Sequence, residues 1–153
     1  DYPDNDPGPW TLLADSQPAE TAKRLEWVLS RTTGYFGVTN YLGERFLAAD
    51  SAYNAFASAL RGRGLAFVDD GAAARRGGGI LRASAERVVD DKLTPVAIDQ
   101  QLSALEAGAQ QHGQALGAAF AYPVTLQKVA QWAAAVEQRG YQLAPASALM
   151  TKR

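Results

Sequence analysis

One arrangement recurs along this chain and restricts its fold more than any other feature: a helical pattern, then a glycine, then a short apolar run. It occurs around Gly64, Gly113 and Gly140. In each case the glycine suits the left-handed residue that ends a helix, and apolar runs of this kind suit strands that are buried on both faces. Helices that alternate with such runs are typical of a parallel sheet covered by helices. The sequence therefore predicts an α/β fold, although periodicity alone does not distinguish an open sheet from part of a barrel.

The same pattern gives the approximate bounds of the elements. Apolar residues at helical spacing predict helices over residues 18–31, 50–63, 94–112 and 123–139. Short apolar runs predict strands over residues 35–39, 65–68, 87–89, 115–120 and 141–144. Residues 71–79 are rich in alanine, arginine and glycine, which favours a loop or a short helix.

The composition of the 153-residue chain excludes several kinds of site. It has no cysteine, which excludes disulfides and thiol nucleophiles, and its one histidine, His112, excludes a metal site built from several histidines of this chain. A formal net charge of −1 predicts neither a nucleic acid nor an anionic membrane as a partner. No apolar run is long enough to span a bilayer, and residues 1–9 are too polar for a signal peptide. Because those nine residues are typical of the interior of a loop, we expect the chain to be a fragment or a processed or truncated product, with a disordered N-terminal tail on an intact domain as the alternative.

Polar residues follow the predicted strands, at the edge where α/β proteins place their chemistry. Asn40 and Tyr41 follow one strand, Tyr122 follows another and Asp90 follows a third. We predict that Asn40 binds substrate, because an amide at the end of a buried strand needs hydrogen-bond partners. Tyr41 and Tyr122 are predicted to bind substrate as rim aromatics, with a lid on the core as the alternative for Tyr41. Asp90 is interpreted as a cap or a solvated carboxylate.

Two charged residues are the predicted catalytic groups. Asp69 ends a predicted strand beside Asp70 and is a candidate general acid or base, with turn formation as the alternative. Arg45 can donate two parallel hydrogen bonds to an anionic or carbonyl oxygen, and its alternative is a surface ion pair with Glu44 or Asp50. No metal ligand is predicted among the candidate residues.

At these residues the chain resembles the divergent polysaccharide deacetylases, a bacterial family related to the NodB-type chitooligosaccharide deacetylases. The matching phrases run in order along the chain: DYPDNDPGP at 1–9, GVTN at 37–40, RGLAFVD at 63–69, YPVTL at 122–126, and RG through PASAL at 139–149. The resemblance implies an α/β fold that is part of a deformed (β/α) barrel of NodB type. Residues 1–153 would then form a single domain that lacks its N-terminal βα units, in a protein of the periplasm or cell envelope.

The activity that the resemblance implies is hydrolysis of acetyl groups on glycans, assisted by a divalent metal such as zinc that polarises the acyl carbonyl and activates water. The substrate would be an acetylated glycan or a small molecule. The resemblance places the family's catalytic base and metal ligands on strands before residue 1. Many relatives have histidine where this chain has Tyr41, and residues 120–123 also lack the histidine common there. Zinc is therefore expected in the full-length family fold and not from this chain alone.

Two other functions remain open from the sequence. The first is a non-catalytic glycan-binding or envelope scaffold protein on the same barrel. The second is an unrelated open-sheet domain that binds a small molecule between strand ends. Zinc with acetate release would indicate the enzyme, whereas glycan binding without either would indicate the scaffold.

Overall fold

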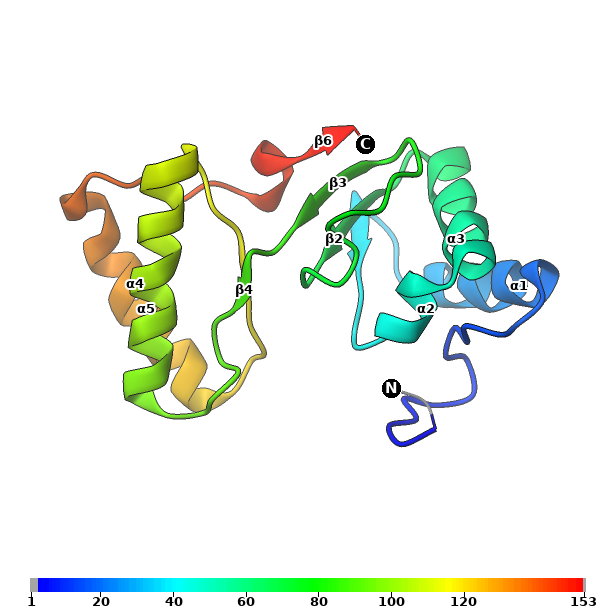
Figure 1. Cartoon of the computed structure of the whole chain (residues 1–153), viewed down its shortest axis with the longest axis horizontal. Coiled ribbons are helices and arrows are strands. Elements are labelled where there is room, and N and C mark those ends of the chain that lie inside the picture. Colours follow the sequence, from blue (N-terminus) through cyan, green and yellow to red (C-terminus); the bar gives the residue numbers. More distant parts are fainter. Residues whose placement is uncertain (1–2, 153) are drawn as a thin grey trace. The chain divides into compact units, whose positions relative to one another are not determined.

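The computed structural model describes residues 3–152, and these divide into two compact units. The first unit comprises the described residues up to Arg82 together with Thr151 and Lys152, and the second runs from Ala83 to Met150. The first unit contains α1 (Pro18–Leu29), β1 (Gly37–Thr39), α2 (Glu44–Ala48), α3 (Asp50–Arg63), β2 (Ala66–Asp69) and β6 (Thr151–Lys152), as labelled in Figure 1. The strand β3 (Leu81–Ser84) begins in the first unit, and its last two residues belong to the second.

The sheet of the first unit has the order β1-β2-β3-β6, in which β1 and β2 are parallel and β3 and β6 are antiparallel. Gly37 lies opposite Ala66 at the start of the parallel pair. A Cβ atom at position 37 would lie 2.6 Å from the Ala66 carbonyl oxygen, so only glycine allows this close approach of the backbones. The register places the ends of β1 and β2 side by side, and the polar residues that follow each strand meet there.

Apolar side chains of α1, α2 and α3 form the core of the first unit against β2. The rings of Phe46 and Phe67 both meet the ring of Phe56 edge to face, at centroid distances of 5.9 and 5.0 Å. The predicted face of α3 is confirmed, because Tyr53, Phe56, Ala57 and Leu60 are all buried. This core therefore holds α1, α2 and α3 against the parallel strands β1 and β2.

The second unit contains β4 (Arg87–Val88), α4 (Pro95–His112), β5 (Gly117–Ala118) and α5 (Pro123–Val136), followed by 3₁₀ turns at Glu137–Arg139 and Ala146–Leu149. The strands β4 and β5 are parallel, and α4 packs beside α5 (Figure 1). Ile98 and Leu102 of α4 are buried in the core of this unit. In the part of the chain that the structure describes, no helix is long and apolar enough to cross a membrane.

The predicted α/β class is confirmed, with helices and parallel strand pairs in both units. One predicted strand is wrong: residues 141–144 are irregular, and the chain forms β6 at Thr151–Lys152 instead. The sequence also failed to indicate β3, because Arg82 interrupts its apolar character. A strand is stabilised by its neighbours in the sheet, so a short run such as β6, which pairs with β3, is defined by its partner more than by its own residues.

Candidate functional site

The chain leaves β1 through a turn of residues 40–43 that Asn40 holds in place. The Asn40 Nδ2 atom donates a hydrogen bond to the Leu42 carbonyl oxygen at 2.9 Å. Its Oδ1 atom accepts one from the Asp70 backbone N–H at 3.1 Å. Leu42 has a φ of +57°, in the left-handed region that branched apolar residues rarely adopt. Asn40 thus links the ends of β1 and β2 and braces this turn; its predicted role in substrate binding stays a prediction.

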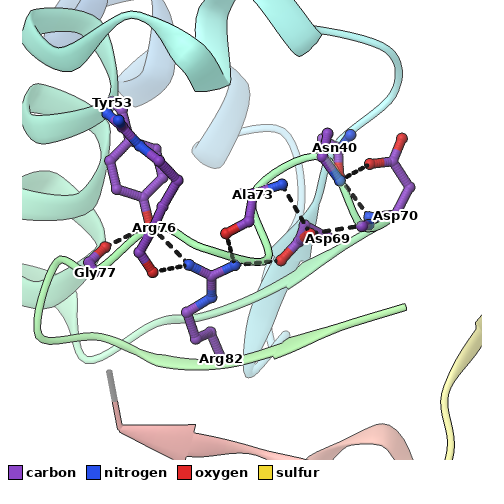
Figure 2. Close-up of polar contacts among 10 residues, drawn as sticks. Asn40, Tyr53, Asp69, Asp70, Ala73, Arg76, Gly77 and Arg82 are labelled. Atoms are coloured by element: carbon purple, nitrogen blue, oxygen red, sulfur yellow. Dashed lines mark hydrogen bonds and ion pairs between the residues drawn. The ribbon is translucent and has the colours of Figure 1, made fainter. Parts of the chain in front are cut away.

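Asp69, the last residue of β2, forms a buried ion pair with Arg82 of β3 (Figure 2). The Asp69 Oδ2 atom lies 2.6 Å from the Arg82 Nη2 atom, and the two side chains are 0% and 1% exposed. The Asp69 Oδ1 atom accepts hydrogen bonds from the backbone N–H groups of Gly71 at 2.9 Å and Ala73 at 3.1 Å. These contacts match the turn-forming alternative for Asp69, and its role as a general acid or base stays a prediction.

The loop after Asp69 closes around the Arg82 guanidinium (Figure 2). Arg82 donates hydrogen bonds to the carbonyl oxygens of Ala73 and Arg76 and, at 3.3 Å, to the Tyr53 hydroxyl oxygen. The Tyr53 hydroxyl in turn donates to the Gly77 carbonyl oxygen at 2.6 Å. Burial raises the pKa of Tyr53 above its usual range, so this phenol stays protonated, and able to donate, to a higher pH than an exposed tyrosine. A buried charge therefore organises the segment between β2 and β3.

A cavity of about 960 Å³ lies beside the turn at residues 40–43 and brings three of the predicted site residues together. Asn40, Tyr41 and Arg45 all line it, together with the N-terminal segment and the last turns of α1. The Tyr41 side chain is 64% exposed, so it lies at the rim and does not cover the core. Most of the remaining lining is apolar, which is the usual character of a ligand pocket with a few polar groups.

Two tryptophans that follow no predicted strand, Trp10 and Trp27, also line this cavity. The rings of Trp10 and Trp27 stack at a centroid distance of 4.3 Å and an interplanar angle of 7°. The Arg31 guanidinium lies 4.5 Å from the centre of the Trp27 ring. The stack ties the N-terminal segment to α1 and gives the cavity an aromatic wall. The chain has only three tryptophans, so the presence of one in the otherwise polar N-terminal segment was the available signal.

Tyr122 belongs to the second unit, where it precedes α5. Its ring centroid lies 6.0 Å from that of Phe120, and the two side chains are 44% and 45% exposed. Asp90 is buried nearby; its Oδ2 atom accepts hydrogen bonds from the Phe120 N–H at 2.8 Å and the Thr125 hydroxyl at 2.9 Å. Asp90 thus fixes the segment that presents these aromatics. The predicted substrate-binding role of Tyr122 stays a prediction.

The donor set of these residues does not fit a metal. Within residues 3–152 no group of three or more histidine, cysteine, aspartate or glutamate side chains is placed to hold an ion. The Asp69 carboxylate is bound by Arg82, and Tyr41 offers a phenol where zinc prefers a neutral imidazole. No metal-assisted step can therefore be assigned to the described side chains.

The fold and the strand-end cavity define an α/β protein with a candidate ligand site at the carboxyl end of its parallel strands. This chain belongs to the divergent polysaccharide deacetylase family, whose model matches residues 1–150. No curated protein matches it.

A solved structure similar to this chain is the crystal structure of an uncharacterized protein from Agrobacterium tumefaciens C58. The two sequences are 35% identical, and the match has a TM-score of 0.91 and covers 97% of this chain. This chain spans 63% of the length of that protein. The family and the shared fold agree with a partial barrel of NodB type, as the resemblance implied.

Proposed function

We propose that this chain binds an acetylated glycan in the cavity beside β1, as part of a divergent polysaccharide deacetylase-type protein of the periplasm or cell envelope. The observation that carries the proposal is that one cavity of about 960 Å³ is lined by Tyr41, Arg45 and Trp10. The family supports a glycan as the ligand. The volume is at the upper end of the range usual for ligand pockets, about 300–1,000 Å³.

The lining suits the two kinds of surface that an acetylated sugar presents. The faces of its ring carry C–H groups, which pack against aromatic rings such as those of Tyr41 and Trp10. Its acetyl carbonyl and hydroxyl oxygens accept hydrogen bonds, and Arg45 carries five N–H donors on a planar fork. Tyr122 of the second unit is not among the residues that line this cavity, and its substrate-binding role is a separate proposal. We therefore expect the ligand to be held by packing of its sugar rings on these aromatic rings and by hydrogen bonds from the Arg45 guanidinium.

The geometry of this chain supports binding more strongly than hydrolysis. Both oxygens of the Asp69 carboxylate already accept hydrogen bonds from Arg82 or from backbone N–H groups. Removing that carboxylate from its buried pair to act as a base would leave the Arg82 charge without its counter-ion. Deacetylation is the second candidate function, favoured by the family to which the chain belongs, and it is a proposal for the full-length protein.

Titration of the protein with an N-acetylated chitooligosaccharide tests the binding proposal. Quenching of tryptophan fluorescence is expected on binding, because Trp10 and Trp27 line the cavity. Tyr41→Ala is expected to weaken binding by about tenfold, the loss of one ring contact of roughly 1.4 kcal/mol. Phe36→Ala is the matched control, since Phe36 is also exposed, at 57%, and does not line the cavity. Equal effects of the two variants would contradict the proposal.

Acetate release from the same oligosaccharide separates binding from hydrolysis. The full-length protein is incubated with the acetylated glycan, and binding and acetate are measured with and without a chelator. Binding without acetate release, unchanged by the chelator, would indicate a glycan-binding protein that lacks deacetylase activity. Saturable acetate release that the chelator abolishes would instead establish the deacetylase.

A further inference from the structure

The turn between β1 and α2 adopts a conformation that its own sequence does not favour. Leu42 lies at φ +57°, and among the described residues it is the only non-glycine residue with a positive φ. The left-handed region brings the Cβ atom of an L-residue close to the following carbonyl group, so a leucine stays there only when its surroundings hold it. Leu42 lines the cavity together with its neighbours Tyr41 and Gly43.

The contact that holds Leu42 is the side-chain amide of Asn40. Its Nδ2 atom donates to the Leu42 carbonyl oxygen at 2.9 Å, so the peptide group after Leu42 is fixed in direction. The amide itself is oriented at its other end, where Oδ1 accepts the hydrogen bond of the Asp70 N–H at 3.1 Å. Both ends of the Asn40 amide are therefore engaged within the protein, which suits a positioning residue better than a direct ligand contact.

The backbone at Asp70 is fixed on both sides by contacts of the neighbouring Asp69 side chain. Asp69 accepts hydrogen bonds from the N–H groups of Gly71 and Ala73, on the far side of Asp70, and is anchored at 2.6 Å to Arg82. The peptide group between Asp69 and Asp70 thus lies next to a completely buried ion pair (Figure 2). A continuous series of contacts runs from Arg82 through Asp69 and the Asp70 backbone to Asn40 and the strained turn.

We propose that the Asp69–Arg82 pair and Asn40 are positioning residues that hold the Tyr41–Leu42 turn in its ligand-binding conformation. The proposal rests on the proposed glycan site, and it assigns these residues to affinity and not to bond cleavage. It connects a buried ion pair, neither of whose residues lines the cavity, through the Asp70 backbone to Asn40, which does line it. Tyr41 is the side chain whose position the network sets.

A double-mutant cycle between positions 40 and 42 tests the proposal. Asn40→Asp keeps the acceptor for the Asp70 N–H but loses the donor to the Leu42 carbonyl, and about tenfold weaker binding of the N-acetylated chitooligosaccharide is expected. Leu42→Gly removes the steric penalty of a positive φ, so in that background Asn40→Asp is expected to weaken binding by no more than about twofold. Asn54→Asp, an exposed amide of α3, is the charge-matched control and should leave binding unchanged. An equal loss in both backgrounds would overturn the proposal.

An NMR measurement keeps the inference separate from the glycan proposal. A positive φ gives a strong intraresidue NOE between the Leu42 amide and Hα protons, which can be recorded without ligand. Asn40→Asp and Asp69→Asn are both expected to weaken this NOE, and Asn54→Asp is not. If the wild-type protein fails to bind the oligosaccharide while the NOE responds in this way, the glycan assignment fails and the positioning network stands. If the NOE is unchanged in the Asn40 and Asp69 variants, the network is refuted whatever the protein binds.

Discussion

Replacement of Asp69 by asparagine is the sharpest perturbation that the first unit offers. Asparagine has nearly the same size and keeps an acceptor for the Gly71 and Ala73 N–H groups, but it presents an NH₂ donor to the Arg82 guanidinium. The carboxylate and the guanidinium are 0% and 1% exposed, so water does not replace the lost charge. Removal of one partner from a buried ion pair costs about 3–5 kcal/mol, because the other charge stays buried without compensation. We expect Asp69→Asn to lower the free energy of unfolding by about that amount, a large part of the 5–15 kcal/mol typical of a domain.

The neighbouring aspartate supplies the matched control. Asp70 is half-buried, and its Oδ1 atom accepts a hydrogen bond from the Ala72 N–H at 3.1 Å. Asp70→Asn keeps that acceptor, so a cost below about 1 kcal/mol is expected. Urea unfolding followed by tryptophan fluorescence and by circular dichroism measures both variants. If Asp69→Asn costs no more than Asp70→Asn, the pair with Arg82 does not stabilise the fold and the reasoning is refuted.

Three further predictions concern other contacts. Glu106→Gln should cost less than about 1 kcal/mol at pH 7, because the Glu106 carboxylate accepts two hydrogen bonds from Arg139, at 2.6 and 3.1 Å, but the Arg139 side chain is 42% exposed and water screens the pair. Arg139 holds the pKa of Glu106 below its usual range. The stabilisation that Glu106 gives is therefore complete above its unfolded-state pKa and should disappear as the pH falls through its lower folded-state pKa. If Glu106→Gln costs the same free energy of unfolding at acid and at neutral pH, this prediction is wrong. Burial raises the pKa of Tyr53, so the tyrosine ionises at a lower pH in the unfolded state than in the folded state. The free energy of unfolding of the wild type should therefore fall above pH ~10, and it should fall by less in Tyr53→Phe, which has no phenol to ionise. Urea unfolding across that pH range measures both. Gly37→Ala should lower the free energy of unfolding by about 2–4 kcal/mol or prevent folding, because the added Cβ atom would lie 2.6 Å from the Ala66 carbonyl oxygen. A melting temperature equal to that of the wild type would contradict this close approach of the two strands.

Much of the local structure could be predicted because its causes are local. The helix α3 was predicted from the spacing of its apolar residues and from Gly64, which ends it at a φ of +66°. The helix α4 begins at Pro95 and is capped as expected by Thr94, whose hydroxyl oxygen accepts a hydrogen bond from the Ala97 N–H at 3.3 Å. Helical periodicity and caps depend on residues within a few positions of each other, so one sequence contains the information.

The candidate site was only partly predictable. Asn40, Tyr41 and Arg45 were selected because they follow an apolar strand, and they do line one cavity. Trp10 was not selected, because nothing near it in the sequence indicates that it stacks on Trp27, 17 positions away. The role of Asn40 was not predictable either, since its partner Asp70 is 30 residues distant.

The sequence by itself determined the alternation of helices and apolar strands, the edge of the sheet where polar residues gather, and the family. Only the tertiary structure decided which partners those polar residues have. Asp69 has the same local context as a catalytic carboxylate at a strand end, yet Arg82, 13 residues later, lies against it in the core. The physical reason is that the state of a charged side chain depends on its burial and on its partner, and packing sets both between segments far apart in the chain.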